Sequence, residues 1–295
     1  MKIDQTIEPY INYISTERRL AARTVTTYSE VLGRFVDYLH SLEIEDVEAV
    51  TAKEVRQWQM TMMDGGWAPA TVKQALAALA SWFRYLRRQK IITTDVMAKV
   101  AAPKLPKHLP VFFREEDVER IYQLPEDDFV SMRNKLILRI FYETGMRRAE
   151  LCGLKEHSFD MSALSVKVLG KRNKERVIPI ENDLAHNIIA YLSLKKQIDN
   201  SSDALLINEN GSPMTKNQIY GVVKKYMQGA KSEKISPHVF RHTFATHLLN
   251  EGADLEAIKE LMGHANVGVT EIYTHVTREH LKEQYRHAHP RAKKK

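Results

Sequence analysis

The chain has 295 residues, of which 43% are hydrophobic and 27% are charged, a balance typical of a globular protein with a packed core. It contains no run of about 18 apolar residues, and its polar start MKIDQTIEPY is unlike a signal peptide, so we expect neither a membrane span nor secretion. The net charge of +7 favours a polyanionic partner, most often nucleic acid.

The first hundred residues are predicted to form a bundle of four helices. Apolar residues recur three and four apart in TIEPYINYI and in RTVTTYSEVLGRFVDYLH. Thr51 is expected to cap a third helix, with Glu54 completing a capping box, and Pro69 to begin a fourth. Three arginines share one face of this last helix: Arg84, Arg87 and Arg88. A solvated face explains them as well as contacts with DNA phosphates do.

A proline-rich stretch divides the chain. APKLPKHLPVF has three prolines in eight residues, which favours an extended segment over a helix. We therefore predict two domains, residues 1–100 and 112–295, joined by a linker over residues 101–111.

The second domain is predicted to be mainly helical. REEDVERIYQLP and the apolar VSMRNKLILRIFYETG read as helices, the second ending at Gly145 in the left-handed conformation. Hydrophobic residues then alternate in ALSVKVLGKRNKERVIPI, which predicts a β-hairpin. The remainder returns to helical periodicity, so the fold class is mainly α with a small antiparallel sheet.

The single cysteine, Cys152, excludes an internal disulfide and fits a reducing, cytoplasmic compartment. It lies in the apolar stretch AELCGL, so a packing role is favoured over that of a thiol nucleophile.

One helix gathers cationic side chains on a single side. In SPHVFRHTFATHLL, Ser236 suits the N-cap, Pro237 suits the first turn, and every fourth residue from Phe240 to Leu248 forms an apolar stripe. A different side carries His238, Arg241 and His242. A solvated face is one interpretation, and a metal site is disfavoured because no glutamate lies between the histidines.

Further basic residues suggest phosphoryl chemistry. TGMRRAEL contains Arg147, GKRNKER contains Lys171, and LMGHANVGVTEIYTHV contains His264 and Tyr273. Arginines can bind phosphodiester oxygens, a lysine or histidine can protonate a departing alkoxide, and a tyrosine hydroxyl can attack phosphorus.

These four motifs, in this order, resemble the catalytic domain of the tyrosine site-specific recombinases, the phage-integrase family. The resemblance runs from about Arg114 to Pro290, and residues 1–100 resemble the family's helical core-binding (SAM-like) domain. The compact size, the IYTHV box and the ending HPRA are most similar to the bacterial Xer branch, which resolves chromosome dimers. Integrases of mobile elements share the same motifs and remain the alternative.

The resemblance implies roles for the residues that move protons or form bonds. Tyr273 would attack phosphorus, form a 3′-phosphotyrosyl intermediate and release a 5′-hydroxyl, as in the transesterification of type IB topoisomerases. Lys171 would protonate the leaving 5′ oxygen, and His238 would assist proton transfer at Tyr273.

The resemblance also implies roles for the residues that hold the phosphate. Arg147 and Arg241 would stabilise the charge on the pentavalent phosphorane, and His264 would hydrogen-bond the phosphate. Glu150 would orient these groups without touching the phosphate itself. His242 is assigned to packing or support.

Two positions depart from the family pattern. Arg148 follows Arg147 where an uncharged residue is usual, and Ala149 stands where serine is common. Three basic residues near these motifs are candidates for contacts with the DNA backbone: Arg148, Arg172 and Lys174.

The implied partner is a double-stranded DNA recombination site, with neither a metal nor another cofactor. The family builds homo- or hetero-tetramers of related recombinases, and a cell-division DNA translocase is a candidate further partner. The short C-terminal helix with Leu281 and Tyr285 is expected to dock on a neighbouring protomer, the alternative being its own domain. The intact motif set disfavours a non-catalytic DNA-binding protein, and the lack of a carboxylate cluster among the motifs disfavours a metal-dependent nuclease.

Overall fold

The computed structural model describes residues 1–105, 111–170, 174–198, 202–263 and 278–290. Backbone contacts separate the chain into two units, Met1–Lys107 and His108–Lys295, which are described individually. Residues 106–110 of the predicted linker lie outside the described residues. Within the described part of the chain, no helix combines the length and the apolar character needed to cross a bilayer.

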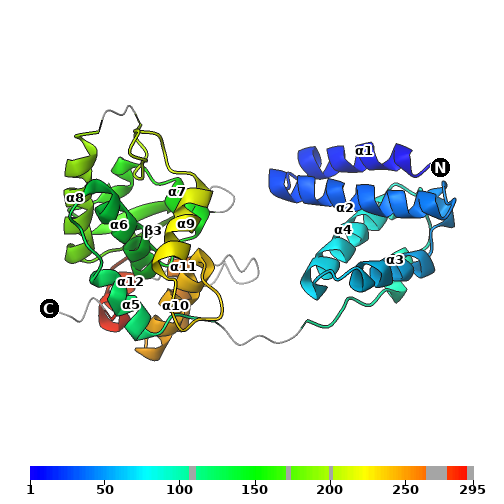
Figure 1. Cartoon of the computed structure of the whole chain (residues 1–295). Helices are drawn as coiled ribbons and strands as arrows, with labels where there is room; N and C mark the ends of the chain where they lie inside the picture. Colours follow the sequence, from blue (N-terminus) through cyan, green and yellow to red (C-terminus); the bar gives the residue numbers. More distant parts are fainter. Residues whose placement is uncertain (106–110, 171–173, 199–201, 264–277, 291–295) are drawn as a thin grey trace. The chain divides into compact units, whose positions relative to one another are not determined.

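The first unit is the predicted bundle of four helices (Figure 1). Its elements are α1 (Asp4–Asn12) with a π-helical turn (Tyr13–Glu17), α2 (Ala22–Ser41), α3 (Ala52–Asp64), α4 (Pro69–Arg88) and two 3-10 turns (Val47–Ala49 and Val96–Lys99). The aromatic side chains of Phe35 and Trp82 are fully buried at its centre.

Local signals set the helix starts in this unit. Thr51 Oγ1 accepts from the backbone N–H of Lys53 at 3.2 Å, and the Thr51 N–H donates to Glu54 Oε2 at 2.9 Å. This is the predicted capping box. Pro69 occupies the first turn of α4, where its missing N–H costs no intrahelical hydrogen bond.

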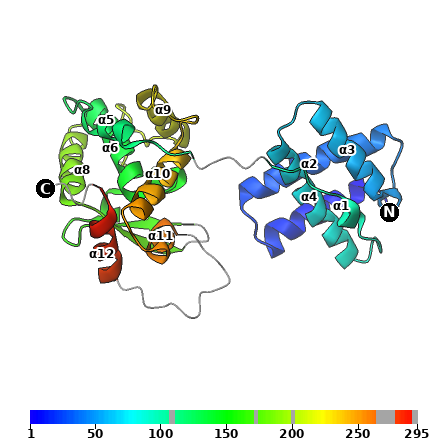
Figure 2. The same cartoon turned by 90° about the horizontal axis from the view of Figure 1, so that it is seen from below.

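In the second unit, helices pack against a small sheet (Figures 1 and 2). Its elements are α5 (Glu115–Tyr122), α6 (Phe129–Thr144), α7 (Arg148–Cys152), a 3-10 turn (Glu156–Ser158), β1 (Phe159–Asp160), β2 (Ser165–Leu169), β3 (Glu175–Pro179), α8 (Asn182–Lys195), α9 (Lys216–Tyr226), α10 (Pro237–Asn250), α11 (Leu255–Met262) and α12 (Arg278–Ala288).

The sheet is antiparallel, in the order β1-β2-β3. Strands β2 and β3 form the predicted hairpin, in which Val166 pairs with Ile178 and Val168 pairs with Arg176. Leu164, predicted to belong to the alternating strand, has a positive φ of 48° and lies in the turn before β2.

Helix α6 runs through the middle of the core and ends where predicted. Gly145 adopts the left-handed conformation at φ 58° and directs its N–H to the carbonyl of Phe141. A Cβ at this position would lie 2.4 Å from Cδ1 of Phe244, so both the backbone angle and the contact with α10 require glycine.

Helix α10 begins at Pro237, as predicted. Ser236 has the extended backbone of an N-cap, although its side chain makes no capping hydrogen bond. The apolar stripe of Phe240, Phe244 and Leu248 is fully buried, which confirms the predicted core face. Cys152 in α7 is half-buried, and its thiol donates to the carbonyl of Met214 at 3.4 Å.

Helix α12 packs against α10, α11 and β3 of its own chain (Figure 2). Tyr285 is fully buried, donates its hydroxyl hydrogen to the carbonyl of Glu143 at 2.9 Å, and stacks on His289 at 4.7 Å between ring centroids. In the single chain, α12 therefore packs on its own domain, which was the alternative to docking on a neighbouring protomer. Docking on a neighbouring protomer stays a prediction for an assembly.

Candidate active site

Seven residues were given a role in the predicted reaction. Four of them lie within the described structure: Arg147, Glu150, His238 and Arg241. The other three, together with the DNA-contact candidate Arg172, lie outside the described residues: Lys171, His264 and Tyr273.

Arg147 is held at the start of α7 by Glu150. The Arg147 backbone N–H donates to Glu150 Oε2 at 2.7 Å, and its Nη1 donates to Oε1 at 2.8 Å. Its Nη2 lies 3.3 Å from the carbonyl oxygen of Gly263, the residue that ends α11. The side chain keeps 35% of its surface exposed, so an anion can reach a guanidinium whose direction is already fixed.

Arg241 lies between the ends of two helices. Its Nη1 donates to the carbonyl of Gly145, after α6, at 2.7 Å, and its Nη2 donates to the carbonyl of Met262, in the last turn of α11. Carbonyls at helix C-termini lack intrahelical donors and carry the negative end of the macrodipole. They therefore suit the guanidinium of Arg241, a residue that is only 6% exposed.

The burial of Arg241 differs from the solvated face that the helical pattern allowed. Burial, and then the positive charges of Arg147 and Arg176, lower the pKa of Arg241 to about 10. The group stays cationic at neutral pH. Because Met262 and Gly263 are adjacent, Arg241 and Arg147 bond to successive carbonyls at one helix end.

Sequence reasoning missed Arg176, on β3. It binds both oxygens of Glu150, from Nη1 at 2.9 Å and from Nη2 at 2.8 Å. The available signal was the strand period, because Arg176 pairs with the buried Val168 and lies two residues before the buried Ile178. An arginine on the apolar face of a hairpin requires a buried partner.

Glu150 remains ionised through these contacts. Burial alone would raise its pKa, but the hydrogen bonds and charges of Arg176 and Arg147 outweigh burial and lower the pKa to about 2. The predicted orienting role of Glu150 is consistent with this geometry.

Replacing Glu150 by glutamine should therefore destabilise the protein in a pH-dependent way. A pKa lowered from 4.5 to about 2 contributes stability above pH 4.5 and loses it as the pH falls towards 2. We expect Glu150→Gln to lower the free energy of unfolding by about 3 kcal/mol at pH 7, with the difference from wild type narrowing below pH 4.5. Urea unfolding of both proteins at several pH values measures this difference in the free energy of unfolding.

Glu175→Gln is the matched control, because Glu175 pairs with Lys167 on the exposed side of the same hairpin. It should change the free energy of unfolding by less than about 1 kcal/mol. A Glu150→Gln difference that is constant from pH 7 to pH 3 would contradict the charge-based account.

His238 and His242 are exposed on α10. Partial burial, and then the charges of His242, Arg241, Arg148 and Arg147, lower the pKa of His238, so its imidazole is neutral at physiological pH and can accept a proton. Among the described residues, no group of three or more histidine, cysteine or acidic side chains is arranged to hold a metal ion.

Two of the DNA-contact candidates in the second unit, Arg148 and Lys174, lie within the described residues. Arg148 is half-buried, with its guanidinium carbon 5.6 Å from the ring centroid of Tyr220. Lys174 is exposed in the hairpin, and its carbonyl accepts from the N–H of Gly170 at 2.8 Å.

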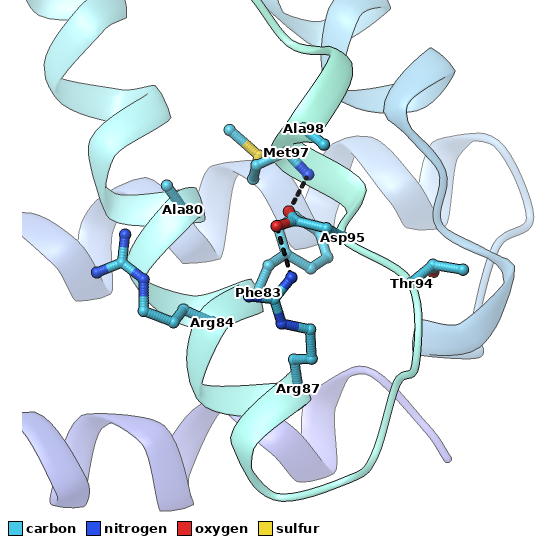
Figure 3. Close-up of a pocket in the computed structure, with 8 residues that line it drawn as sticks. All are labelled: Ala80, Phe83, Arg84, Arg87, Thr94, Asp95, Met97 and Ala98. Atoms are coloured by element: carbon cyan, nitrogen blue, oxygen red, sulfur yellow. Dashed lines mark hydrogen bonds and ion pairs between the residues drawn. The ribbon is translucent and has the colours of Figure 1, made fainter.

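The three arginines of α4 have different surroundings, and Figure 3 shows two of them, Arg84 and Arg87. Arg84 is exposed. Arg87 forms an ion pair with Asp95 at 2.5 Å, and Arg88 donates to the hydroxyl of Tyr13 at 3.0 Å. Asp95 offsets the charge of Arg87, so this face is less cationic than the sequence suggested.

Two positive groups aimed by buried contacts can stabilise a phosphoryl group as negative charge develops on it. Arg147 is directed by Glu150, and Arg241 is fixed by two main-chain carbonyls, so neither needs to reorganise when the charge appears.

Family models and related proteins match the sequence of this chain. The phage integrase family matches residues 111–280, and the phage integrase N-terminal SAM-like domain matches residues 7–90. Tyrosine recombinase XerC of Bacillus pumilus is 34% identical over 294 residues, covering 97% of this chain and 96% of that protein. Tyrosine recombinase XerD of Halalkalibacterium halodurans is 34% identical over 299 residues, covering 98% of this chain and 99% of that protein.

Solved structures agree in fold. XerH site-specific recombinase bound to a palindromic difH substrate, in a post-cleavage complex, is 25% identical with a TM-score of 0.73, covering 90% of this chain and 80% of that one. A lambda integrase dimer bound to a COC′ core site has a TM-score of 0.72 at 17% identity, a likeness of fold alone; the match covers 94% of this chain and 100% of that one. The chain therefore belongs to the phage integrase family, as a tyrosine recombinase related to the Xer proteins.

Proposed function

We propose that this chain is a site-specific DNA recombinase that resolves chromosome dimers in the cytoplasm. It cuts and rejoins DNA through a 3′-phosphotyrosyl intermediate. The observation that carries the proposal is the pair of fixed cations, Arg147 held by Glu150 and Arg241 held between two helix ends, in a chain that matches XerC and XerD proteins over nearly its whole length.

The proposed cleavage step is a transesterification. The Tyr273 oxygen forms a bond to phosphorus as the bond to the 5′ oxygen breaks, with His238 accepting the tyrosine proton and Lys171 giving a proton to the leaving oxygen. The reverse step, with a 5′-hydroxyl from a partner strand as the nucleophile, rejoins the DNA. Because the phosphotyrosyl ester conserves the energy of the broken bond, rejoining requires no ATP.

The remaining residues stabilise charge. Arg147 and Arg241 bind the non-bridging oxygens of the phosphate, His264 adds a hydrogen bond, and Glu150 holds Arg147 in place. Fixed cations in the site provide the electrostatic stabilisation that phosphoryl transfer needs.

We further propose that the chain acts on double-stranded DNA as part of a tetramer, with copies of itself or with a related recombinase. XerH and lambda integrase were each solved on DNA, lambda integrase as a dimer, which supports a DNA-bound multimer. Contacts with phosphates would make its affinity fall steeply with salt. A cell-division DNA translocase is proposed as the partner that activates it.

Deleting the gene in the source bacterium tests the proposed biological role. Dimeric chromosomes should accumulate only while homologous recombination is active, because sister exchange produces them. The wild-type gene should restore segregation, and a Tyr273→Phe gene should not. Normal segregation in the deletion strain, together with failure of a mobile element to excise, would replace this role with that of a mobile-element integrase.

A further inference from the structure

Arg176 connects three elements around the two site arginines. Its Nη1 and Nη2 bind the two oxygens of Glu150 on α7, and its Nε donates to the carbonyl of Leu261 on α11 at 2.8 Å. All three guanidinium nitrogens thus bond within the protein, and only 10% of the side chain is exposed. Arg176 is therefore poorly placed to bind a DNA phosphate itself.

Gly263 makes room for this side chain. A Cβ on Gly263 would lie 3.1 Å from Cδ and 3.2 Å from Nη1 of Arg176, which is closer than ordinary van der Waals contact. A side chain at position 263 would therefore press on the Arg176 side chain, which bonds to the carbonyl of Leu261 two residues earlier.

The charges explain how a second arginine bound to Glu150 affects Arg147. Glu150 also holds Arg147, and a carboxylate paired with Arg147 alone would compete with a DNA phosphate for that guanidinium. Arg176 supplies a second positive charge to the same carboxylate. The group of three then has a net charge of +1, and Arg147 is oriented without being neutralised.

Building on the proposed function, we propose that Arg176 is a positioning residue of the recombination site. It holds the Glu150 carboxylate so that Glu150 aims Arg147 at the scissile phosphate. It also fixes β3 to α7 and α11, the elements next to which the sequence places Lys171 and His264. Its effect falls on the rate of cleavage, and DNA affinity is unchanged.

The test compares single-turnover cleavage of a nicked DNA substrate with affinity for the same DNA. Arg176→Gln should slow cleavage about 100-fold, because a misplaced catalytic group costs about that much, while affinity stays within about twofold of wild type. Arg176→Lys keeps the charge but loses the planar fork, so it should fold like wild type and cleave at an intermediate rate. Thermal unfolding of each variant sets an assay temperature at which it is folded.

A second comparison separates positioning from a purely structural role. Glu150→Gln in the Arg176→Gln background removes the carboxylate that competes for Arg147, so the double variant should cleave faster than Arg176→Gln. The matched control is Lys167→Gln, which removes one charge from β2 of the same hairpin, where Lys167 pairs with the exposed Glu175. It should cleave at the wild-type rate.

Three results would overturn the inference: cleavage by Arg176→Gln within twofold of wild type, a loss of DNA affinity equal to the loss of rate, or a double variant slower than Arg176→Gln. If wild type itself forms no covalent adduct, the proposed function fails and the inference fails with it. If wild type cleaves DNA and the Arg176 variants cleave it equally fast, the inference fails and the proposed function stands.

Discussion

Replacing Tyr273 by phenylalanine should abolish recombination and leave DNA binding intact. The substitution removes one oxygen atom, the proposed nucleophile, and keeps the aromatic ring. Loss of a nucleophile from a catalytic group that acts as a unit lowers the rate by at least about 10⁴-fold. Single-turnover strand cleavage and a gel-shift titration, on the same DNA, measure the two quantities.

Tyr226→Phe is the control for loss of a tyrosine hydroxyl elsewhere in the same unit. The Tyr226 hydroxyl accepts from Asn134 Nδ2 at 3.2 Å, on α6, and takes no part in the proposed chemistry. This variant should recombine like wild type. Equal activity of Tyr273→Phe and Tyr226→Phe would eliminate Tyr273 as the nucleophile.

Replacing Arg241 by alanine should lower the cleavage rate by about 10³-fold, because one preorganised donor to a developing oxyanion contributes a factor of about 10²–10³. The variant also leaves the carbonyls of Gly145 and Met262 without this donor, so some stability is lost as well. Arg241→Lys retains the charge and should fall between wild type and alanine, since a lysine cannot reproduce the two directed bonds.

Arg133 provides the matched control for the structural part of this effect. It is 7% exposed, close to the 6% of Arg241, and its Nη1 also donates to a main-chain carbonyl, that of Ile207 at 3.1 Å. Arg133→Ala should lose stability but cleave normally at a temperature where it is folded. If both alanine variants lose cleavage equally when folded, Arg241 has only a structural role.

Residues with strong local conformational demands could be predicted from the sequence. The left-handed Gly145, the capping box at Thr51 and the proline starts of α4 and α10 all lie where the sequence places them, because each depends on its immediate neighbours. The two-residue strand β1 was not predicted, since two residues show no period.

The surroundings of the site residues depend on contacts between distant segments, so they could not be predicted in the same way. Arg241 belongs to the cationic side of α10 by its spacing, yet it is buried, because α6 and α11 bring two free carbonyls to it. Arg176 on β3 pairs with Glu150 on α7, so no local sequence pattern predicts this ion pair. Helix spacing does not show which buried acceptor a cation will find.

The most direct test of the central claim is a covalent-trapping measurement. Wild type and Tyr273→Phe are mixed with nicked duplexes from a candidate site library in the presence of EDTA, and SDS-resistant DNA–protein adducts are isolated and digested for mass spectrometry. We predict that only wild type forms adducts, each with the 3′ phosphate of the DNA on the peptide that contains Tyr273. Adducts with both proteins, or cleavage that occurs only with a divalent metal and leaves no adduct, would contradict the tyrosine mechanism.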